Sequence, residues 1–200
     1  MKLSFDEIGR GTPGDCHPEL ERSAEYHRGE WGMGSATVEE GAFLYGLTMA
    51  LKPDMAVETG TETGYTAAWI GRALRDANHG RLVTIEHNFE QAQAARDNLR
   101  VYGVQDRVVV WTDDAVSHIR SLADGTVNMA LVDTAIGHRL QEVDALMPKL
   151  AMHAVVCVHD TNPRHPMAGG VKLLRDLYAM RCFSVVHLPT PRGLTLLQLV

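Results

Sequence analysis

The sequence predicts an α/β protein with a doubly wound, mostly parallel sheet of seven strands in a Rossmann-like arrangement. From residue 55 onward, short apolar runs alternate with stretches whose apolar residues recur every three or four positions. This alternation of strands and helices is typical of parallel sheets. The last two apolar runs, 182–187 and 194–199, are separated only by residues 188–193. That connection is too short for a crossover helix, so it predicts a hairpin that adds one antiparallel strand.

The individual elements follow from the spacing of the apolar residues. Before the final pair, strands are expected at 55–58, 81–86, 107–111, 127–132 and 154–158. The fifth is nearly continuous in apolar character, as expected for a strand that is buried on both faces. Helices are expected at 64–75, along 92–102 up to Gly103, after Asp114, from about 140 to Pro148, and around 173–177.

The first 54 residues have a different character. Gly, polar residues and aromatics dominate up to Ser35, and then Thr37-Val38-Glu39-Glu40 has the pattern of a capping box that opens a helix ending near Pro53. The loop around Trp31-Gly32-Met33-Gly34 could cover a binding site as a lid. A loosely ordered N-terminal arm explains the same residues equally well.

Size and composition predict one globular domain. Residues 1–200 are expected to form it, with the arm and first helix in 1–54 and the core in 55–200. Hydrophobic residues make up 45% and charged residues 22% of the chain, which argues against disorder. The formal net charge is −6 and no dense Lys/Arg cluster occurs, so no nucleic-acid partner is expected. A small-molecule substrate is expected instead, and a homodimer is left open.

No membrane segment is expected, because no apolar run approaches the roughly 18 residues that a membrane helix needs. The N-terminus also lacks the apolar stretch of a signal peptide. The three cysteines (Cys16, Cys157 and Cys182) have no metal-ligand spacing. They are interpreted as reduced packing residues, which predicts a cytoplasmic protein.

The turn after the first strand, Glu58-Thr59-Gly60-Thr61-Glu62-Thr63-Gly64, is the candidate binding turn. Such a turn brings backbone N–H groups to the carboxyl edge of the sheet, and Gly60 and Gly64 allow a ligand to come close. A tight βα connection without a ligand is the alternative. The carboxylates of Glu58 and Glu62 would repel the pyrophosphate of a dinucleotide and suit a ligand with positive groups. S-adenosylmethionine carries an ammonium and a sulfonium and no phosphate, so the charge favours it over NAD.

Glu86 ends the second strand, beside the first. An acidic residue at this point can accept hydrogen bonds from both hydroxyls of a ribose. The alternative is a solvated charge near the start of the following helix. Position and context favour the ligand role.

Three segments resemble the motifs of class I methyltransferases. Val57 to Thr66 resembles motif I, Thr84-Ile85-Glu86-His87 resembles the acidic second-strand motif, and Asp113-Asp114-Ala115 is similar to the turn that contacts adenine, with Asp113 in place of the usual glycine. The resemblance covers about residues 40–200 and is to the catechol and caffeoyl-CoA O-methyltransferase-like group and its bacterial small-molecule relatives. It implies the strand order 3-2-1-4-5-7-6 with the last strand antiparallel, and S-adenosylmethionine as cofactor. The cofactor-binding residues that it implies are Glu58, Gly60, Thr61, Gly64, Tyr65, Thr66, Glu86, His87, Asp113, Asp114, Ala115 and Asp133.

Asp133 and Asp160 end the fourth and fifth strands, which the implied order makes neighbours. Two carboxylates at one edge suit Mg²⁺ or another divalent cation, which could lower the pKa of an acceptor hydroxyl. The resembling enzymes use two Asp and one Asn as metal ligands, but Thr161 follows Asp160 here and Asn162 comes one position later. Thr161 is therefore the predicted third ligand. The alternative is that Asp133 is a polar strand end and Asp160 caps the following loop.

His159 and His138 are the other catalytic candidates beside Asp133 and Asp160, since either could serve as general base for a hydroxyl. Arg139, Arg164 and His165 could bind an anionic substrate, although solvated loop charges are the commoner explanation. The predicted function is S-adenosylmethionine-dependent O-methylation of a small molecule, with or without a metal. A non-catalytic cofactor-binding module of the same fold and, less favoured by the acidic turn, an NAD-dependent oxidoreductase are the alternatives.

Overall fold

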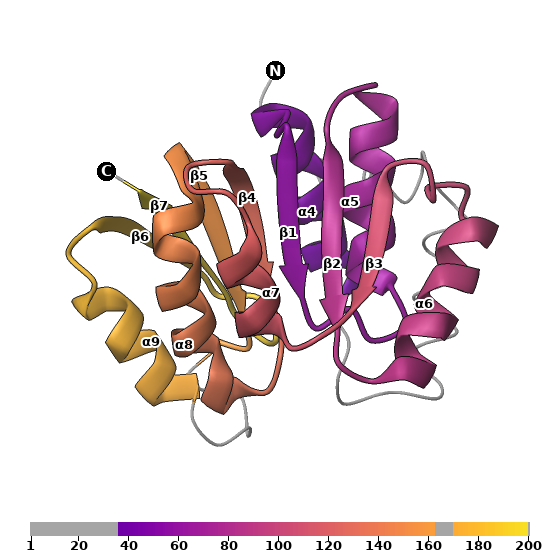
Figure 1. Ribbon diagram of the computed structural model, residues 1–200. Coiled ribbons are helices and arrows are strands. Elements are labelled where there is room, and N and C mark those ends of the chain that lie inside the picture. Colours follow the sequence, from indigo (N-terminus) through magenta and orange to yellow (C-terminus); the bar gives the residue numbers. More distant parts are fainter. Residues whose placement is uncertain (1–35, 163–169, 200) are drawn as a thin grey trace.

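The computed structural model describes residues 36–162 and 170–199, and these form a seven-stranded sheet with helices on both faces (Figure 1). The strand order is β3-β2-β1-β4-β5-β7-β6. The first five strands pair in parallel, and β7 runs antiparallel to both β5 and β6. The predicted fold class and strand order are therefore confirmed. The strands are β1 (Met55–Thr59), β2 (Arg81–Glu86), β3 (Val108–Thr112), β4 (Val127–Val132), β5 (Leu150–His159), β6 (Phe183–Leu188) and β7 (Leu194–Leu199).

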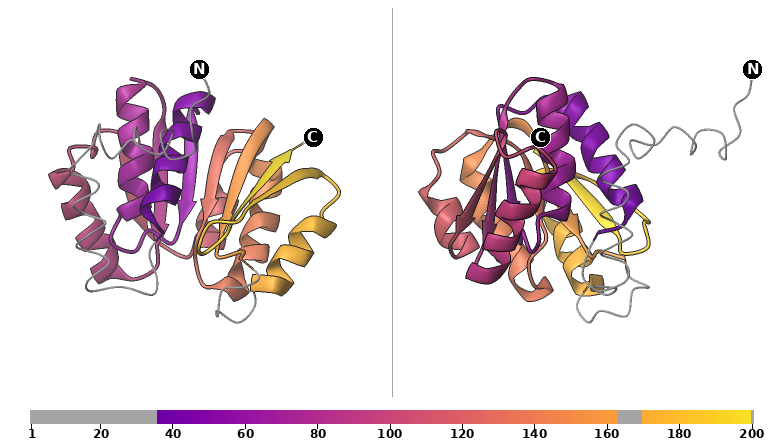
Figure 2. Two further views of the ribbon diagram at one scale, coloured as in Figure 1. Left: turned by 180° about the vertical axis from the view of Figure 1, so that it is seen from behind. Right: turned by 90° about the vertical axis from the view of Figure 1, so that its right-hand side faces the viewer.

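Two layers of helices cover the sheet, as the two views of Figure 2 show. Strand alternation divides the core between these layers: Ala56 of β1 belongs to the apolar cluster under α4 and α5, and Val57 to the cluster under α7 and α8. The helices are α4 (Val38–Leu51), α5 (Tyr65–Asp76), α6 (Phe89–Val101), α7 (Ala115–Ser121), α8 (Ile136–Leu146) and α9 (Gly170–Ala179), with a 3₁₀ turn, η1 (Met147–Lys149), after α8.

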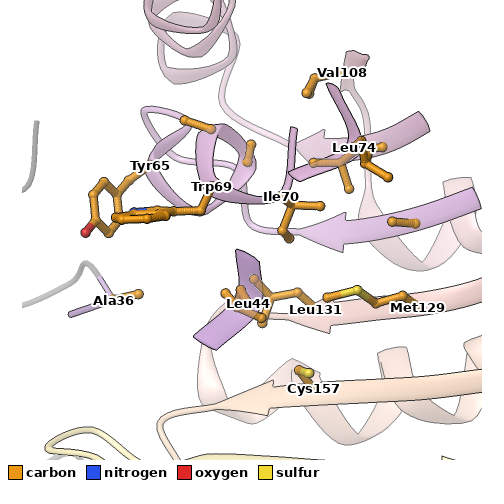
Figure 3. Packing of buried hydrophobic residues seen from close by; sticks show 14 of the residues in the cluster. Ala36, Leu44, Tyr65, Trp69, Ile70, Leu74, Val108, Met129, Leu131 and Cys157 are labelled. Atoms are coloured by element: carbon orange, nitrogen blue, oxygen red, sulfur yellow. The ribbon is translucent and has the colours of Figure 1, made fainter. Parts of the chain in front are cut away.

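Helix α4 begins with the predicted capping box. The Thr37 hydroxyl accepts from the Glu40 N–H, and the Glu40 carboxylate accepts from the Thr37 N–H. The helix packs closely on α5 because Gly41 leaves room for the indole of Trp69; a Cβ at Gly41 would lie 2.4 Å from Trp69 Nε1. Leu44 fills the space between Trp69 and the sheet residue Leu131 (Figure 3). This packing holds the first turn of α4 against the carboxyl edge of the sheet.

Strand β5 begins at Leu150, four residues before the predicted start. Met152 is 82% exposed and His153 has a φ of 63°, so the first half of the strand lacks the apolar pattern that marks the second half. Its register with β4 shifts between Val127 and Met129. The other strands match the predicted boundaries to within one residue.

Some predictions fall outside the described part of the chain. The Trp31–Gly34 loop, the rest of the arm before Ala36 and Cys16 lie there, as do Arg164 and His165. Among the residues that are described, each helix is too short or too polar to cross a membrane.

Candidate active site at the carboxyl edge of the sheet

Three cavities meet at the carboxyl ends of the parallel strands, and Gly60 borders all of them. The largest, of about 280 Å³, lies between Glu86 and Asp160. The second, of about 240 Å³, is bordered by Asp113 and Ala115. The third is much smaller and lies at the start of α5. The glycine turn after β1 is therefore the common wall of the whole crevice, as expected for an open α/β sheet.

Glu86 borders the largest cavity, as the sequence predicted for a ribose-binding acid. Its side chain is 4% exposed, and its two carboxylate oxygens accept from the N–H groups of Glu62 and Asn88, each at 2.9 Å. His87 Nδ1 lies 3.0 Å from the same carboxylate, with the imidazole largely exposed. Glu86 thus faces the cavity and also fixes the glycine turn to the end of β2.

The second cavity brings together the predicted adenine-contact residues Asp113, Asp114 and Ala115. Asp114 caps α7 by accepting from the N–H of Ser117 at 2.8 Å, which fixes the turn. His138 borders this cavity as well, and it does not border the cavity that Asp160 lines. The prediction that His138 acts beside Asp133 and Asp160 therefore needs correction, because the first turn of α8 directs it to the cavity of Asp113 and Ala115.

The smallest cavity lies at the N-terminus of α5, where Thr61, Tyr65, Thr66 and Asp133 border it. Gly64 is the N-cap residue of α5 with a φ of 87°. A helix N-terminus presents unpaired backbone N–H groups that favour an anionic ligand group such as a carboxylate.

Gly60 has a φ of 80°, and a Cβ there would lie 2.4 Å from the carbonyl oxygen of Asp133. Both the backbone conformation and the contact exclude a side chain. Gly60 is consequently needed for the turn itself, in addition to any role in leaving room for a ligand.

Glu58 does not border any of the three cavities, and the prediction that it faces a cationic ligand is corrected. Its side chain is fully buried, and it accepts hydrogen bonds from the hydroxyls of Thr66 and Thr84, both at 2.5 Å. Strand alternation explains this, because Glu58 shares a face with Ala56 and so lies under α5. Burial raises the pKa of Glu58 to about 7, against the lowering effect of the two hydroxyls. Glu58 therefore links β1, β2 and α5 beneath the turn.

Asp133 and Asp160 lie together at the ends of β4 and β5, as predicted. Their carboxylates and the imidazole of His159 offer ligand atoms that lie within 4.8 Å of one another. The guanidinium of Arg139 contacts both carboxylates: its Nη2 donates to Asp133 Oδ1 at 3.0 Å and to Asp160 Oδ2 at 2.8 Å. Arg192 Nη2 lies 2.7 Å from the other oxygen of Asp160. The two carboxylates are thus paired with two guanidinium groups.

His159 is buried between two carboxylates. Its Nδ1 lies 3.0 Å from Asp133 Oδ1 and its Nε2 lies 3.0 Å from Glu40 Oε2. Carboxylate oxygens only accept, so both ring nitrogens donate and the ring is an imidazolium. Burial by itself would lower the pKa of His159, but Asp133 and Glu40 outweigh it and raise the pKa to about 10. A ring that keeps its proton near neutral pH does not serve as general base, which corrects that prediction.

Thr161, the predicted third metal ligand, is fully buried and lies on the side of β7. Its hydroxyl accepts from Thr195 Oγ1 at 2.8 Å. Its backbone N–H donates to the carbonyl of Gly193, which ties the end of β5 to the turn before β7. The antiparallel hairpin therefore holds Thr161 through both its hydroxyl and its backbone.

Sequence reasoning missed Glu40 and Arg192 and misjudged Arg139. Arg139 is 2% exposed and joins the ends of β4 and β5, so it is not a solvated loop charge. Glu40 was predicted only as part of a capping box, yet its carboxylate also accepts from the Thr190 hydroxyl at 2.5 Å. A charged residue within six positions of Asp133, at the start of a helix over the sheet edge, was the available signal for Arg139.

A sheet of this order, with a glycine turn after β1 and an acid at the end of β2, defines the class I methyltransferase fold. Residues 57–161 match the family model described as a methyltransferase domain. The match covers more than half of the chain, which therefore belongs to that family.

The curated relatives include catechol O-methyltransferases. That of Mycobacterium tuberculosis is 32% identical over 99 residues, which are 50% of this chain and 44% of the relative. That of Niastella koreensis is 30% identical over 102 residues, 50% of this chain and 45% of the relative. The matched segments thus span less than half the length of these relatives.

Solved structures match over most of the chain. The O-methyltransferase TomG of Streptomyces achromogenes, solved in complex with S-adenosylmethionine, is 26% identical with a TM-score of 0.76, covering 90% of this chain and 89% of that one. A Podospora anserina methyltransferase bound to S-adenosylhomocysteine, 18% identical with a TM-score of 0.77, covers 100% of this chain and 98% of that one. The second likeness is evidence for the fold alone.

Proposed function

We propose that this chain binds S-adenosylmethionine in the crevice around Gly60 and transfers its methyl group to a hydroxyl of a small molecule. One observation carries the proposal: Gly60 separates three cavities whose other walls hold Glu86, Asp133 and the Asp113–Ala115 turn. These are the positions that the motif resemblance assigns to the cofactor. The O-methyltransferase relatives support the same reaction.

Each cavity suits one part of the methyl donor. Glu86 borders the largest cavity, and its carboxylate would accept from the ribose hydroxyls. The Asp113–Ala115 cavity suits the adenine, and the N–H groups at the start of α5 suit the carboxylate of the methionine part. Asp133 and Glu62 border the same small cavity and supply negative charge for its ammonium.

When bound, S-adenosylmethionine supplies a methyl group whose bond to sulfur breaks as a bond to the acceptor oxygen forms, while the acceptor proton leaves to solvent. The chain contributes by holding the two reactants in line, which can supply much of the rate. Asp133 borders both the largest and the smallest cavity, so it marks where donor and acceptor would meet.

Calorimetric titration of the purified chain with S-adenosylmethionine and S-adenosylhomocysteine tests the proposal. We expect saturable binding, weakened about tenfold or more by Glu86→Gln, because hydrogen bonds to a charged acceptor are worth roughly 1.5–3 kcal/mol. Gln keeps an acceptor oxygen for one of the two backbone N–H groups that Glu86 binds, whereas Ala keeps none. The exposed Glu90→Gln in α6 is the matched control. Absence of heat with both ligands at millimolar concentration would reject the proposal.

A non-catalytic cofactor-binding module is the second candidate. It is favoured by Thr161, which is directed to β7 and away from Asp160's cavity, so that the acceptor side departs from the resembling enzymes. Radiolabelled methyl transfer to a panel of catechols, sugars and phenolic acids separates the two candidates. Cofactor binding without transfer to any member would favour the module.

A further inference from the structure

We infer that Arg139 is the resident cation of the strand-end carboxylates, in the place where the resembling enzymes hold a metal ion, and that the site binds no divalent cation. If the proposed function holds, methyl transfer then needs no metal. Only this last consequence rests on the proposed function. The assignment of Arg139 rests on the contacts of its guanidinium and on the directions of Thr161 and Asn162, the two described residues that follow Asp160.

The guanidinium of Arg139 occupies the space between the carboxylates. Beyond its bonds to Asp133 and Asp160, its Nε donates to the carbonyl of Thr134 at 2.7 Å and its Nη1 donates to the carbonyl of His159. Its nitrogens thus reach both carboxylates and the backbone after both strands. The planar fork of Arg suits this kind of multiple contact far better than a point charge would.

The charges in this cluster balance. The carboxylates of Asp133 and Asp160 face two guanidinium groups, those of Arg139 and Arg192. All but Asp133 have side chains that are at most 9% exposed. A dication entering this cluster would add two uncompensated charges among side chains that are largely buried, and burial of unpaired charge is costly.

Within the described part of the chain, the two residues that follow Asp160 are directed elsewhere. The Thr161 hydroxyl bonds to Thr195, as described above. The Asn162 amide donates to the carbonyls of Thr190 and Pro191, at 3.0 and 3.1 Å. Magnesium demands nearly octahedral oxygen coordination, and this edge offers it two carboxylates that already accept from Arg139. With Arg139 in place, the donor set therefore does not fit the metal that the sequence resemblance implied.

Entry of a metal would require Arg139 to leave. Its side chain is 3% exposed, and of the residues that it contacts, Asp160 and His159 are buried as well. Displacement would exchange one buried cation for another and leave two carbonyl groups without their donor. Arg139 is consequently a positioning residue that sets the charge and the spacing of Asp133 and Asp160.

Titration of the ligand-free chain with Mn²⁺, followed by electron paramagnetic resonance, tests this inference directly. We expect no bound Mn²⁺ in the wild type at millimolar concentration. Arg139→Ala removes the resident cation and is expected to gain a Mn²⁺ site, whereas Arg139→Lys retains the charge and is not. Arg100→Ala, which removes an exposed guanidinium paired with Asp97, is the matched control and is expected to behave as the wild type.

Two outcomes would overturn the inference. One is Mn²⁺ bound by the wild type and released by Asp160→Asn, a comparison that does not require Arg139→Ala to fold. The other is a folded Arg139→Ala variant that binds no more Mn²⁺ than Arg100→Ala.

Calorimetry with S-adenosylmethionine, with and without EDTA, keeps the inference separate from the proposed function. Failure of the wild type to bind the methyl donor would reject the proposed function and leave the assignment of Arg139 standing. Binding that is unchanged by EDTA, together with methyl transfer in EDTA to any member of the acceptor panel, supports both. Methyl transfer that EDTA abolishes and Mg²⁺ restores would overturn the inference while leaving the proposed function in place.

Discussion

Glu40 and Glu58 are both fully buried glutamates near the carboxyl edge of the sheet, and their surroundings drive them to opposite states. Glu40 lies in the charged cluster over β4 and β5, where His159 donates to it. Glu58 lies under the glycine turn over β1 and β2, where its partners are the hydroxyls of Thr66 and Thr84. Burial raises the pKa of both groups. The imidazolium of His159 outweighs burial at Glu40 and lowers the pKa to about 2, whereas the two hydroxyls leave that of Glu58 at about 7.

The two halves of the crevice are therefore stabilised differently, one by ion pairs and the other by hydrogen bonds from hydroxyl groups. On the acceptor side, formal charges are paired and hold α4, β4, β5 and the hairpin together. On the donor side, the carboxyl of Glu58 is held by hydroxyl groups, and the carboxylates of Glu62 and Glu86 border the cavities. The burial of an acidic side chain therefore does not by itself predict its protonation state, because the charge of its hydrogen-bond partner also sets the pKa.

The largest expected effect comes from removing Glu40 from the charged cluster over β4 and β5. Glu40→Ala leaves the imidazole of His159 without one of its two acceptors and removes the N-terminal cap contact to Thr37. Removing one partner of a buried ion pair typically costs about 3–5 kcal/mol of the free energy of unfolding. Glu39→Ala is the control, because Glu39 occupies the same first turn of α4 but is exposed, and its loss should cost no more than about 1 kcal/mol. Urea denaturation at pH 7 measures both. Equal losses would mean that Glu40 acts only through the helix terminus.

The next largest effect is a pH dependence of the free energy of unfolding that arises from Glu58. The folded pKa of Glu58, about 7, lies above the ordinary value of 4.5, so the folded state keeps this proton to a higher pH than the unfolded state does. The contribution of Glu58 to stability is therefore highest below pH 4.5 and is lost as the pH rises through about 7. At roughly 1.4 kcal/mol for each pKa unit, the loss is about 3 kcal/mol.

Glu58→Gln tests this dependence, because the amide cannot ionise. Its free energy of unfolding, relative to the wild type, is expected to rise across the same pH interval. Thr66 and Thr84 then have only one oxygen to donate to, which adds a cost that does not vary with pH. The exposed Glu90→Gln should show no such trend. A constant difference between Glu58→Gln and the wild type from pH 4.5 to 8 would contradict the raised pKa.

The same contrast explains what the sequence could predict. Periodicity gave the sheet, because alternation along strands and three-to-four spacing along helices are local signals. The glycine turn and Glu86 are also local, and both border the crevice as predicted. Strand alternation could also have predicted that Glu58 lies under α5, because Glu58 and Ala56 share one face of β1. The motif resemblance instead led to the prediction that Glu58 faces a ligand.

The charged cluster over β4 and β5 depends on contacts between residues that are far apart in the sequence, which local patterns do not predict. His159 and Glu40 are 119 positions apart, and Glu40 and Thr190 are 150 apart. Which cation meets Asp133 and Asp160 depends on where α8 and the β6–β7 turn lie over the sheet edge. The sequence predicted a divalent cation as the positive partner of the two adjacent carboxylates, and the structure supplies Arg139 and Arg192.

The smallest effect separates the two protonation states of Glu58. Thr66→Val removes one hydroxyl donor from its carboxyl and keeps nearly the same volume. A hydrogen bond between neutral groups contributes about 0.5–1.5 kcal/mol, and one to a charged group about 1.5–3 kcal/mol. The loss should therefore be near 1 kcal/mol at pH 5, where Glu58 holds its proton, and about twice that at pH 8, where it does not. Urea denaturation at the two pH values gives both numbers, and Thr66→Ser, which keeps the hydroxyl, is the control. In the Glu58→Gln background the cost of Thr66→Val should be the same at both pH values, because the partner no longer changes its charge. A cost that still grows with pH in that background would assign the effect to a group other than Glu58.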